Sequence, residues 1–590
     1  MRHLFTLNSY LLRYKWHLIG GSFFVLISVL FSVIPPQYVR ESFNAVEEAI
    51  RSNAENNTSG ISSETRNLIL FYGLIIIGSA LLKGLFMFFM RQTLIVMSRH
   101  IEYDLKNSVY QHYQKLSQRF YRANSTGDLM NRISEDVSRV RMYLGPALMY
   151  GINTSILVVV VVQRMLSINV SLTIYVLLPL PILSYLIYRV SHLINRRSER
   201  VQAQLSVIST FVQETLSGIR VLKANVQEKY LAERYDKETD IYYDRNEKLY
   251  RVNALFGPLM LLLVGLSTII IIYIGGMEAI RGNITIGNIA EFIMYVNMLT
   301  WPVASIGWVT SIVQRAEASM ERINDFLDEK PDIVSPTDEP LHLNGQIRWE
   351  NVSFTYPHTG IKALEDVSFE IKPGETLAII GETGSGKSTI AALQSRLFDP
   401  TSGLIYLDEK DLKEINLEEY REQIAVVPQD VFLFSDTIYN NIAFGIDNPT
   451  QEMVEEAAKS AGLHNSIMDF PEKYQTRLGE RGVTLSGGQK QRTALARALI
   501  KKPRLLILDD CLSAVDTETE DFILKAIRSY SKSISSIIIS HRVTSVQHAD
   551  MILVLKNGQV IEKGNHNQLI KSDSYYLSIY RKQLEKEMVK

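Results

Sequence analysis

Long apolar runs dominate the first 310 residues of the chain, whereas short alternating segments dominate the rest. A helix that crosses a membrane needs about 20 mostly apolar residues. Six stretches meet this requirement, and they lie at 16–34, 68–90, 143–162, 168–187, 255–274 and 289–309. The pattern therefore predicts an all-α transmembrane domain of six helices within residues 1–320.

The segments between these runs fall into two kinds. Residues 91–142 and 188–253 are rich in charge and keep helical apolar spacing, so we expect the membrane helices to continue into water and return. Two helices of about 25 residues would each reach about 38 Å at 1.5 Å per residue. By contrast, "QRMLS" and "EAIRGNITIG" are short enough to be tight turns, and Pro179 and Pro181 predict a kink in the fourth helix.

Basic residues set the predicted orientation in the membrane. Residues 91–142 hold nine Lys or Arg, whereas residues 41–66 hold two Arg against five Glu. Since Lys and Arg favour the cytoplasmic side, we expect the N-terminus and both long excursions there, in a multi-pass protein of the cell membrane. Lys83 lies inside the second run. It is either a functional residue within the membrane or, as we favour, a residue whose ammonium group reaches the cytoplasmic interface.

Composition excludes several other classes. The formal net charge is −1, so no bulk electrostatic argument points to nucleic acid. The single cysteine, Cys511, rules out an intramolecular disulfide and a four-thiol metal site. We expect Cys511 to be a packing residue beside a buried strand.

The pattern changes after the last apolar run. Residues 321–344 include three prolines near their end and are predicted to be a linker, and residues 345–580 alternate between short strands and helices. Within them, "ETLAIIGETGSGKSTI" is an apolar strand followed by G-x-x-x-x-G-K-S. Backbone N–H groups of such a loop curl around phosphates, the lysine places its charge on them, and the serine can ligate Mg²⁺. The predicted cradle comprises Gly381, Thr383, Gly384, Ser385, Gly386, Lys387, Ser388 and Thr389.

Two further motifs complete the picture. "RLLILDD" is a strand of the kind found in a covered parallel sheet, and Asp509 at its end is placed to hold Mg²⁺. "LSGGQKQR" opens a helix with Ser486, Gly487, Gly488 and Gln489, and is therefore a second candidate phosphate cradle. Since one bound nucleotide has little use for two cradles, we expect a dimer in which each chain closes on the nucleotide of the other.

These motifs, in this order, resemble the half-size ATP-binding-cassette (ABC) exporters of the multidrug and lipid type. The resemblance implies six transmembrane helices with long cytoplasmic extensions, followed by an α/β P-loop (RecA-like) nucleotide-binding domain with a helical subdomain. It further implies that ATP and Mg²⁺ bind, that Tyr356 in "VSFTYP" stacks on adenine, and that Gln429 in "VVPQD" contacts Mg²⁺ and the attacking water. It also implies that His541 contacts the γ-phosphate, that Asp516 acts across the dimer, and that the tips of the cytoplasmic excursions dock on the ATPase domains.

One position departs from the family pattern. In this family the strand "RLLILDD" is the Walker B motif, and Asp509 is its aspartate. The next residue is usually glutamate, which orients the attacking water, but here it is Asp510. A carboxylate withdrawn by over an ångström can slow a reaction about 10²-fold. We therefore expect a heterodimer, in which this chain holds ATP in a slow site. Its intact signature motif, "LSGGQ" at residues 485–489, would complete the competent site of its partner.

Other functions remain open at this stage. They are a homodimeric lipid or peptide exporter in which aspartate is tolerated, and a nucleotide-gated regulator or channel. A soluble cassette ATPase acting on nucleic acid is disfavoured by the six membrane spans.

Overall fold

The structure is a computed structural model, and it describes residues 2–56, 62–479, 482, 484–512, 517–530, 534–571 and 574–588. Internal contacts divide the chain into two compact units. The first comprises Met1–Tyr113 and Gly127–Glu329, and the second comprises Gln114–Thr126 and Lys330–Lys590.

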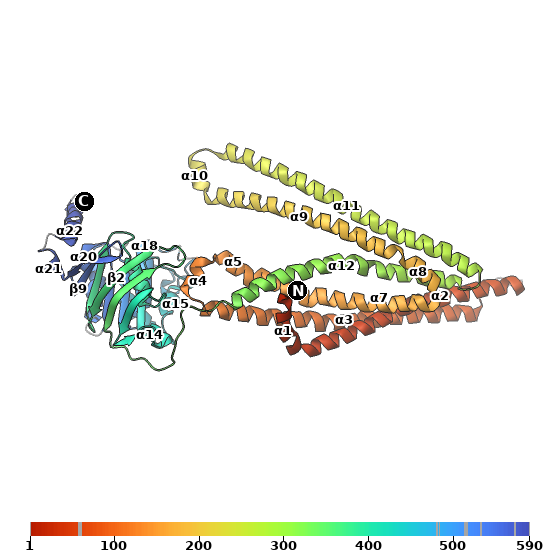
Figure 1. The fold of residues 1–590 in the computed structure, drawn as a ribbon, viewed down its shortest axis with the longest axis horizontal. Coiled ribbons are helices and arrows are strands. Elements are labelled where there is room, and N and C mark those ends of the chain that lie inside the picture. The colour runs from red at the N-terminus through yellow and green to blue at the C-terminus, as the bar shows by residue number, and fades with distance from the viewer. Residues whose placement is uncertain are drawn as a thin grey trace. The chain divides into compact units, whose positions relative to one another are not determined.

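The first unit is entirely helical in its described residues (Figure 1). Its helices are η1 (His3–Leu7), α1 (Asn8–Arg13), α2 (Lys15–Asn56), α3 (Ser63–Lys115), α5 (Thr126–Asn131), η2 (Arg132–Asp136), α6 (Val137–Met142), η3 (Tyr143–Ala147), α7 (Leu148–Ile168), α8 (Val170–Leu177), α9 (Pro179–Ser217), α10 (Ile219–Ala224), α11 (Glu228–Ile280) and α12 (Ile286–Leu327). Among the described residues, five helical segments are long and apolar enough to cross a membrane, at Lys15–Glu55, Ser63–Lys115, Thr126–Ile168, Glu228–Ile280 and Ile286–Leu327. The remaining predicted span, 168–187, is divided between α8 and α9, which meet at Leu178. Leu178 keeps helical dihedral angles, and the interruption follows from Pro179, which has no N–H to donate.

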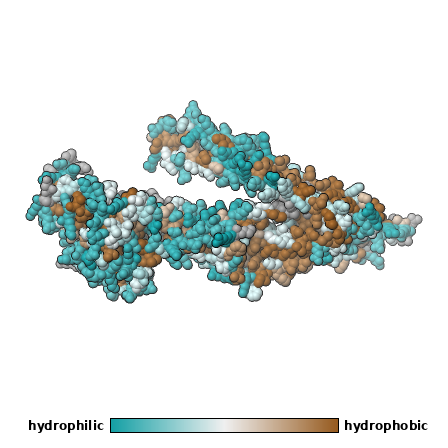
Figure 2. Space-filling model, viewed as in Figure 1, coloured by the Kyte–Doolittle hydropathy of each residue, from teal (hydrophilic) through white to brown (hydrophobic). Residues whose placement is uncertain are grey.

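The long helices run without interruption from apolar into charged sequence. Helices α3 and α11 each contain 53 residues, which corresponds to about 80 Å at 1.5 Å per residue. Helices α9 and α11 lie side by side as a hairpin closed by α10 (Figure 1). Figure 2 shows apolar side chains gathered over the middle of this unit, whereas hydrophilic side chains cover more of the α9–α11 hairpin towards α10, with apolar patches among them. This distribution is typical of helices that leave a membrane and continue into water.

One predicted turn is wrong. The residues "QRMLS" belong to α7, which continues to Ile168, and the chain reverses at Asn169. Asn169 is extended, and its side chain accepts a hydrogen bond from Leu172 N at 2.8 Å, so it caps α8. The other short link is a turn as expected, since α11 ends at Ile280 and Thr285 caps α12.

The second unit is an α/β domain with two sheets. Its strands are β1 (Ile347–Thr355), β2 (Lys362–Ile371), β3 (Thr376–Gly381), β4 (Ser402–Leu407), β5 (Lys410–Asp411), β6 (Ile424–Val427), β7 (Leu505–Asp509), β8 (Ser535–Ile539), β9 (Met551–Lys556) and β10 (Gln559–Gly564). The antiparallel sheet has the order β2-β1-β4-β5, and the mainly parallel sheet has the order β10-β9-β3-β8-β7-β6. Helix α12 continues to Leu327, into the expected linker, and the last described helix ends at Met588.

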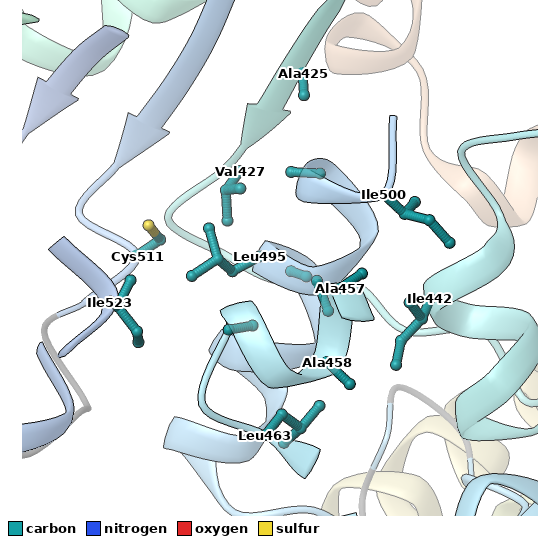
Figure 3. Packing of buried hydrophobic residues seen from close by; sticks show 14 of the residues in the cluster. Ala425, Val427, Ile442, Ala457, Ala458, Leu463, Leu495, Ile500, Cys511 and Ile523 are labelled. Carbon is teal, nitrogen blue, oxygen red and sulfur yellow. The ribbon is translucent and has the colours of Figure 1, made fainter. Parts of the chain in front are cut away.

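The helices of this unit are α4 (Gln118–Ala123), α13 (Lys387–Gln394), α14 (Leu417–Gln423), α15 (Ile438–Ala443), α16 (Gln451–Ser460), α17 (His464–Met468), η4 (Lys473–Gln475), α18 (Gly487–Leu499), α19 (Thr517–Tyr530), α20 (Val543–Val546), α21 (His566–Leu569) and α22 (Tyr575–Met588). Several of them form a helical subdomain that shares a buried apolar cluster with strands β6, β7 and β8, and Cys511 belongs to this cluster (Figure 3). Cys511 is 2% exposed, and burial raises the pKa of its thiol to about 12. The predicted fold class is confirmed, and Cys511 is a packing residue.

Candidate nucleotide-binding site

The parallel sheet brings three motifs to one edge. Strand β3 pairs in parallel with β8, and β8 pairs in parallel with β7, so that Asp509 lies beside Ile539. Gly381, Asp509 and His541 therefore lie at or just beyond neighbouring carboxyl ends. Ligands of open α/β sheets bind at this edge.

Close packing explains two glycines of the loop between β3 and α13. A Cβ atom on Gly381 would lie 2.2 Å from the carbonyl oxygen of Leu555. Gly386 adopts φ +98°, and a Cβ atom there would lie 2.3 Å from the carbonyl oxygen of Ala363. Any side chain at these positions would displace the backbone that forms the cradle.

The loop holds a buried lysine. Lys387 is 6% exposed, and its Nζ donates hydrogen bonds to the carbonyl oxygens of Gly381 at 2.9 Å and Glu382 at 2.7 Å. Burial lowers the pKa of Lys387, whereas Asp510 and Asp509 act in the opposite direction. These carbonyls keep the ammonium group inside the loop, where an incoming phosphate could replace them as the partner.

Ser388 and Asp509 provide a pair of adjacent oxygens. Ser388 Oγ donates to Asp509 Oδ1 at 3.0 Å. Burial raises the pKa of Asp509, and the hydrogen bond from Ser388 lowers it. Within the described residues no group of three or more His, Cys, Asp or Glu side chains could hold a metal. A hydroxyl and one carboxylate do fit Mg²⁺, which prefers a few protein oxygens together with phosphate and water. Bound there, the cation would neutralise phosphate charge.

A hollow of about 520 Å³ joins these groups, within the size range of small-ligand pockets. Predicted residues that line it are Tyr356, Thr383, Gly384, Gly386, Lys387, Ser388, Thr389, Gln429, Asp509, Asp510 and His541. Gly381 and Ser385 lie in the same loop, and Ser385 Oγ is buried with no hydrogen-bond partner among the described residues. Asp516 lies outside the described residues.

Tyr356 is fixed at the rim of this hollow. Its hydroxyl lies 3.1 Å from Thr389 Oγ1, and its ring meets Phe354 edge to face with the centroids 4.9 Å apart. The guanidinium group of Arg122, from α4, lies 5.0 Å from the ring centroid of Tyr356. The tip of the first long excursion, residues 91–142, therefore contacts the residue expected to stack on adenine.

Asp510 has an unusual backbone. It adopts φ +46°, in the left-handed region, and its N–H donates to the carbonyl oxygen of Ile539 at 2.9 Å. Aspartate tolerates this conformation better than most residues do. The backbone position is thus held by β8, and the carboxylate is carried on one methylene group.

The signature residues do not join the pocket. Ser486 caps α18, its Oγ accepts from Gln489 N at 3.3 Å, and the Gln489 side chain accepts from Ser486 N at 3.0 Å. Ser486 and Gly487 are exposed, and none of residues 486–489 lines the nucleotide pocket within the described part of the chain. The second cradle therefore lies outside the pocket that the first one lines.

Sequence reasoning missed one part of the pocket. The turn between β9 and β10 contributes Asn557 and Gly558, and Gly558 N donates to the carbonyl oxygen of Ser385 at 3.1 Å. Both residues have positive φ. The Asn-Gly pair between two apolar strands is a strong hairpin signal, but its position against the phosphate loop depends on the tertiary fold.

Comparison with known proteins agrees with this geometry. The ABC transporter transmembrane region matches residues 18–303, and the ABC transporter family matches residues 364–513. The multidrug resistance-like ATP-binding protein MdlA of Escherichia coli (strain K12) is 33% identical over 583 residues, covering 98% of this chain and 96% of the relative. The chain belongs to the ABC transporter family.

Two more similarities extend over most of this ABC transporter chain. The probable multidrug resistance ABC transporter ATP-binding/permease protein YheI of Bacillus subtilis (strain 168) is 34% identical over 534 residues. The match covers 90% of this chain and 91% of the relative. A solved bacterial Atm1-family ABC exporter with ATP bound has a TM-score of 0.80 at 26% identity, covering 96% of this chain and 98% of that chain. The chain is therefore a half-size ABC exporter, a multi-pass membrane ATPase that binds ATP and functions as a dimer.

Proposed function

We propose that this half-transporter exports amphipathic drugs or lipids across the cell membrane by alternating access, with its N-terminus and ATPase domain in the cytoplasm. Several relatives support this substrate class. MdlA and YheI are named for multidrug resistance, and an ATP-dependent lipid A-core flippase of Nitrosococcus oceani is 34% identical, covering 86% of each chain. ATP binding would favour one conformation of the dimer over the other, which is what alternating access requires of nucleotide binding. Hydrolysis at the partner's site would then reset the dimer and give the cycle its direction.

The partner chain is proposed to be a different half-transporter. The composition of the nucleotide pocket carries this proposal. The pocket is lined by an intact phosphate loop (the Walker A motif, residues 381–388) and by Asp510. Among the described residues, none of the signature residues lines it. The pocket can bind Mg·ATP through Ser388, Gln429 and Asp509, whereas the shortened carboxylate is badly placed to orient water. The exposed signature of this chain would complete a pocket in the partner that carries glutamate.

Exposed apolar surface on both units also supports a second chain. In the first unit, α10 and the residue that follows its C-cap expose Ile219, Val221 and Val226. In the second unit, Phe434 stacks on Phe444 with the centroids 4.6 Å apart, and both rings are exposed. Apolar side chains that gather at the surface, as Phe434 and Phe444 do, mark interaction sites. We propose that such surfaces couple the ATPase domains of the dimer to the membrane helices.

Replacing Asp510 by glutamate tests the proposed slow site. We expect Asp510→Glu to raise the ATP turnover of the purified full-length chain at least tenfold, because the longer side chain restores the position of the carboxylate. The affinity for ATP should change by less than about twofold, since Lys387 and Asp509 are untouched. Asp510→Asn is the matched control and should not raise turnover. Equal turnover of the wild type and Asp510→Glu would contradict the proposal.

A further inference from the structure

Helix α22 packs against the ATPase core and reaches two loops of the nucleotide pocket. Its apolar side carries Tyr576, Ile579 and Tyr580, which pack with Val543 and Val546 of α20 in one buried cluster. Packing accounts for this side of the helix. Two side chains of α22 also make polar contacts, and each contacts a different loop of the pocket.

The first polar contact involves Gln583. Its Nε2 donates to the carbonyl oxygen of His541 at 2.7 Å, and its Oε1 accepts from Val543 N at 2.8 Å. The orientation of the amide follows from its partners, because a carbonyl needs a donor and an N–H needs an acceptor. One side chain therefore holds the backbone on both sides of Arg542, immediately after the predicted γ-phosphate ligand.

The same loop is held from a second direction. Arg542 Nη1 donates to Glu520 Oε2 at 2.8 Å, and Ser545 Oγ donates to the other oxygen of that carboxylate. Glu520 is 3% exposed and lies on α19. Arg542 N also donates to Ser540 Oγ at 3.0 Å. The loop is thus fixed between α19 and α22, whereas the imidazole of His541 is left to line the pocket.

The second polar contact of α22 is made by Tyr575, at the start of the helix. Its hydroxyl donates to the carboxylate of Glu382 in the phosphate loop, and Lys556 Nζ lies 4.9 Å from its ring centroid. The Glu562 carboxylate accepts hydrogen bonds from the N–H groups of Tyr575 and Tyr576, which fixes where the helix begins. Tyr575 and Gln583 are eight residues apart, or about 12 Å along a helix.

We infer that α22 positions both loops for the nucleotide, and that Gln583 in particular is a positioning residue that sets His541 against the γ-phosphate. This inference rests on the proposed role of His541. Because only the γ-phosphate would meet His541, loss of Gln583 should weaken a triphosphate more than a diphosphate. Two hydrogen bonds to the loop backbone are lost in Gln583→Ala, so the imidazole is no longer held at one position.

The test compares the affinities of the full-length chain for Mg·AMP-PNP and Mg·ADP. AMP-PNP is used because its affinity does not depend on the hydrolysis rate of the site. We expect Gln583→Ala to weaken AMP-PNP at least threefold and to leave ADP unchanged. Gln583→Glu should have the same effect, because it keeps the acceptor for Val543 N but places an anion against the carbonyl of His541. Lys582→Ala, the exposed neighbour on the same helix, is the control and should match the wild type.

His541→Ala separates the two possible failures. The readout is the ratio of the affinity for AMP-PNP to the affinity for ADP. If His541→Ala keeps the wild-type ratio, the proposed role of His541 is wrong and the inference falls with it. If His541→Ala lowers the ratio but Gln583→Ala and Gln583→Glu match Lys582→Ala, His541 keeps its role and the positioning role of Gln583 is overturned. A uniform loss of both affinities in Gln583→Ala, with a lowered melting temperature, would show general stabilisation and would likewise overturn it.

Discussion

Two helices of the chain, α13 and α18, begin with glycine-rich segments of similar local chemistry. They differ in how many other elements of the chain surround the segment. At α13 the phosphate loop encloses Lys387, and strands β7 and β8 bring Asp509 and His541 to the same hollow. At α18 the glycines are at the surface or partly exposed, and Ser486 and Gln489 cap the helix. The N-terminus of a helix carries a partial positive charge that attracts phosphate, but it becomes a nucleotide-binding site only when other elements surround it. The chain therefore carries one nearly complete phosphate site and one half of another.

Removing the lysine of the complete site should give the largest effect. We expect Lys387→Ala to weaken ATP binding about 100-fold, because a buried ammonium group contributes charge-assisted hydrogen bonds to phosphate. Equilibrium binding of radiolabelled ATP to the full-length chain measures this. Lys362→Ala is the matched control, since Lys362 lines the same pocket but pairs with Glu365. If Lys387→Ala and Lys362→Ala both bind ATP as the wild type does, the loop before α13 is not the complete site, and the contrast between α13 and α18 is wrong.

A charge placed in the half-site should separate hydrolysis from binding. We expect Gly488→Asp to lower the ATP turnover of the assembled transporter at least tenfold, because a carboxylate at a helix N-terminus repels the phosphate that it would otherwise attract. Binding of ATP to the pocket of this chain should stay within about twofold of the wild type. A parallel loss of binding in the isolated chain would show that α18 belongs to the same site as α13.

The aromatic residue at the rim should have the smallest effect of the three. Tyr356→Ala is expected to weaken ATP binding about fivefold. This corresponds to about 1 kcal/mol, the low end of the range of about 1–3 kcal/mol for stacking of a base on an aromatic side chain. Tyr356→Phe keeps the ring and loses only the contact with Thr389, so it should lie within about twofold of the wild type. An inverted order, with the phenylalanine variant the weaker binder, would mean that the hydroxyl and not the ring face holds the nucleotide.

The sequence alone predicted those elements whose functional residues lie within a few positions of one another along the chain. The glycine spacing around Lys387 requires a strand, a loop and a helix in that order, and the structure has β3, the loop and α13 there. The same holds for the capped start of α18 at Ser486. Long apolar runs likewise predicted membrane helices, because span length is set by bilayer thickness.

Tertiary packing determined the features that were missed. The reversal at Asn169 depends on which residue caps α8, since the "QRMLS" residues are compatible with helix. Gln583 meets the carbonyl of His541 across 42 residues of chain, and Arg122 reaches Tyr356 from a segment far upstream. No local pattern signals such pairs, because each depends on how whole elements pack.

The central claim is that the pocket of this chain holds ATP without cleaving it at a useful rate. The most direct measurement binds Mg·ATP to the purified full-length chain alone, removes free nucleotide, and identifies the retained nucleotide after an hour at 25 °C. Lys387→Ala sets the background of retention. Retained nucleotide that is mainly ATP is the predicted result, and nucleotide recovered mainly as ADP would contradict the claim.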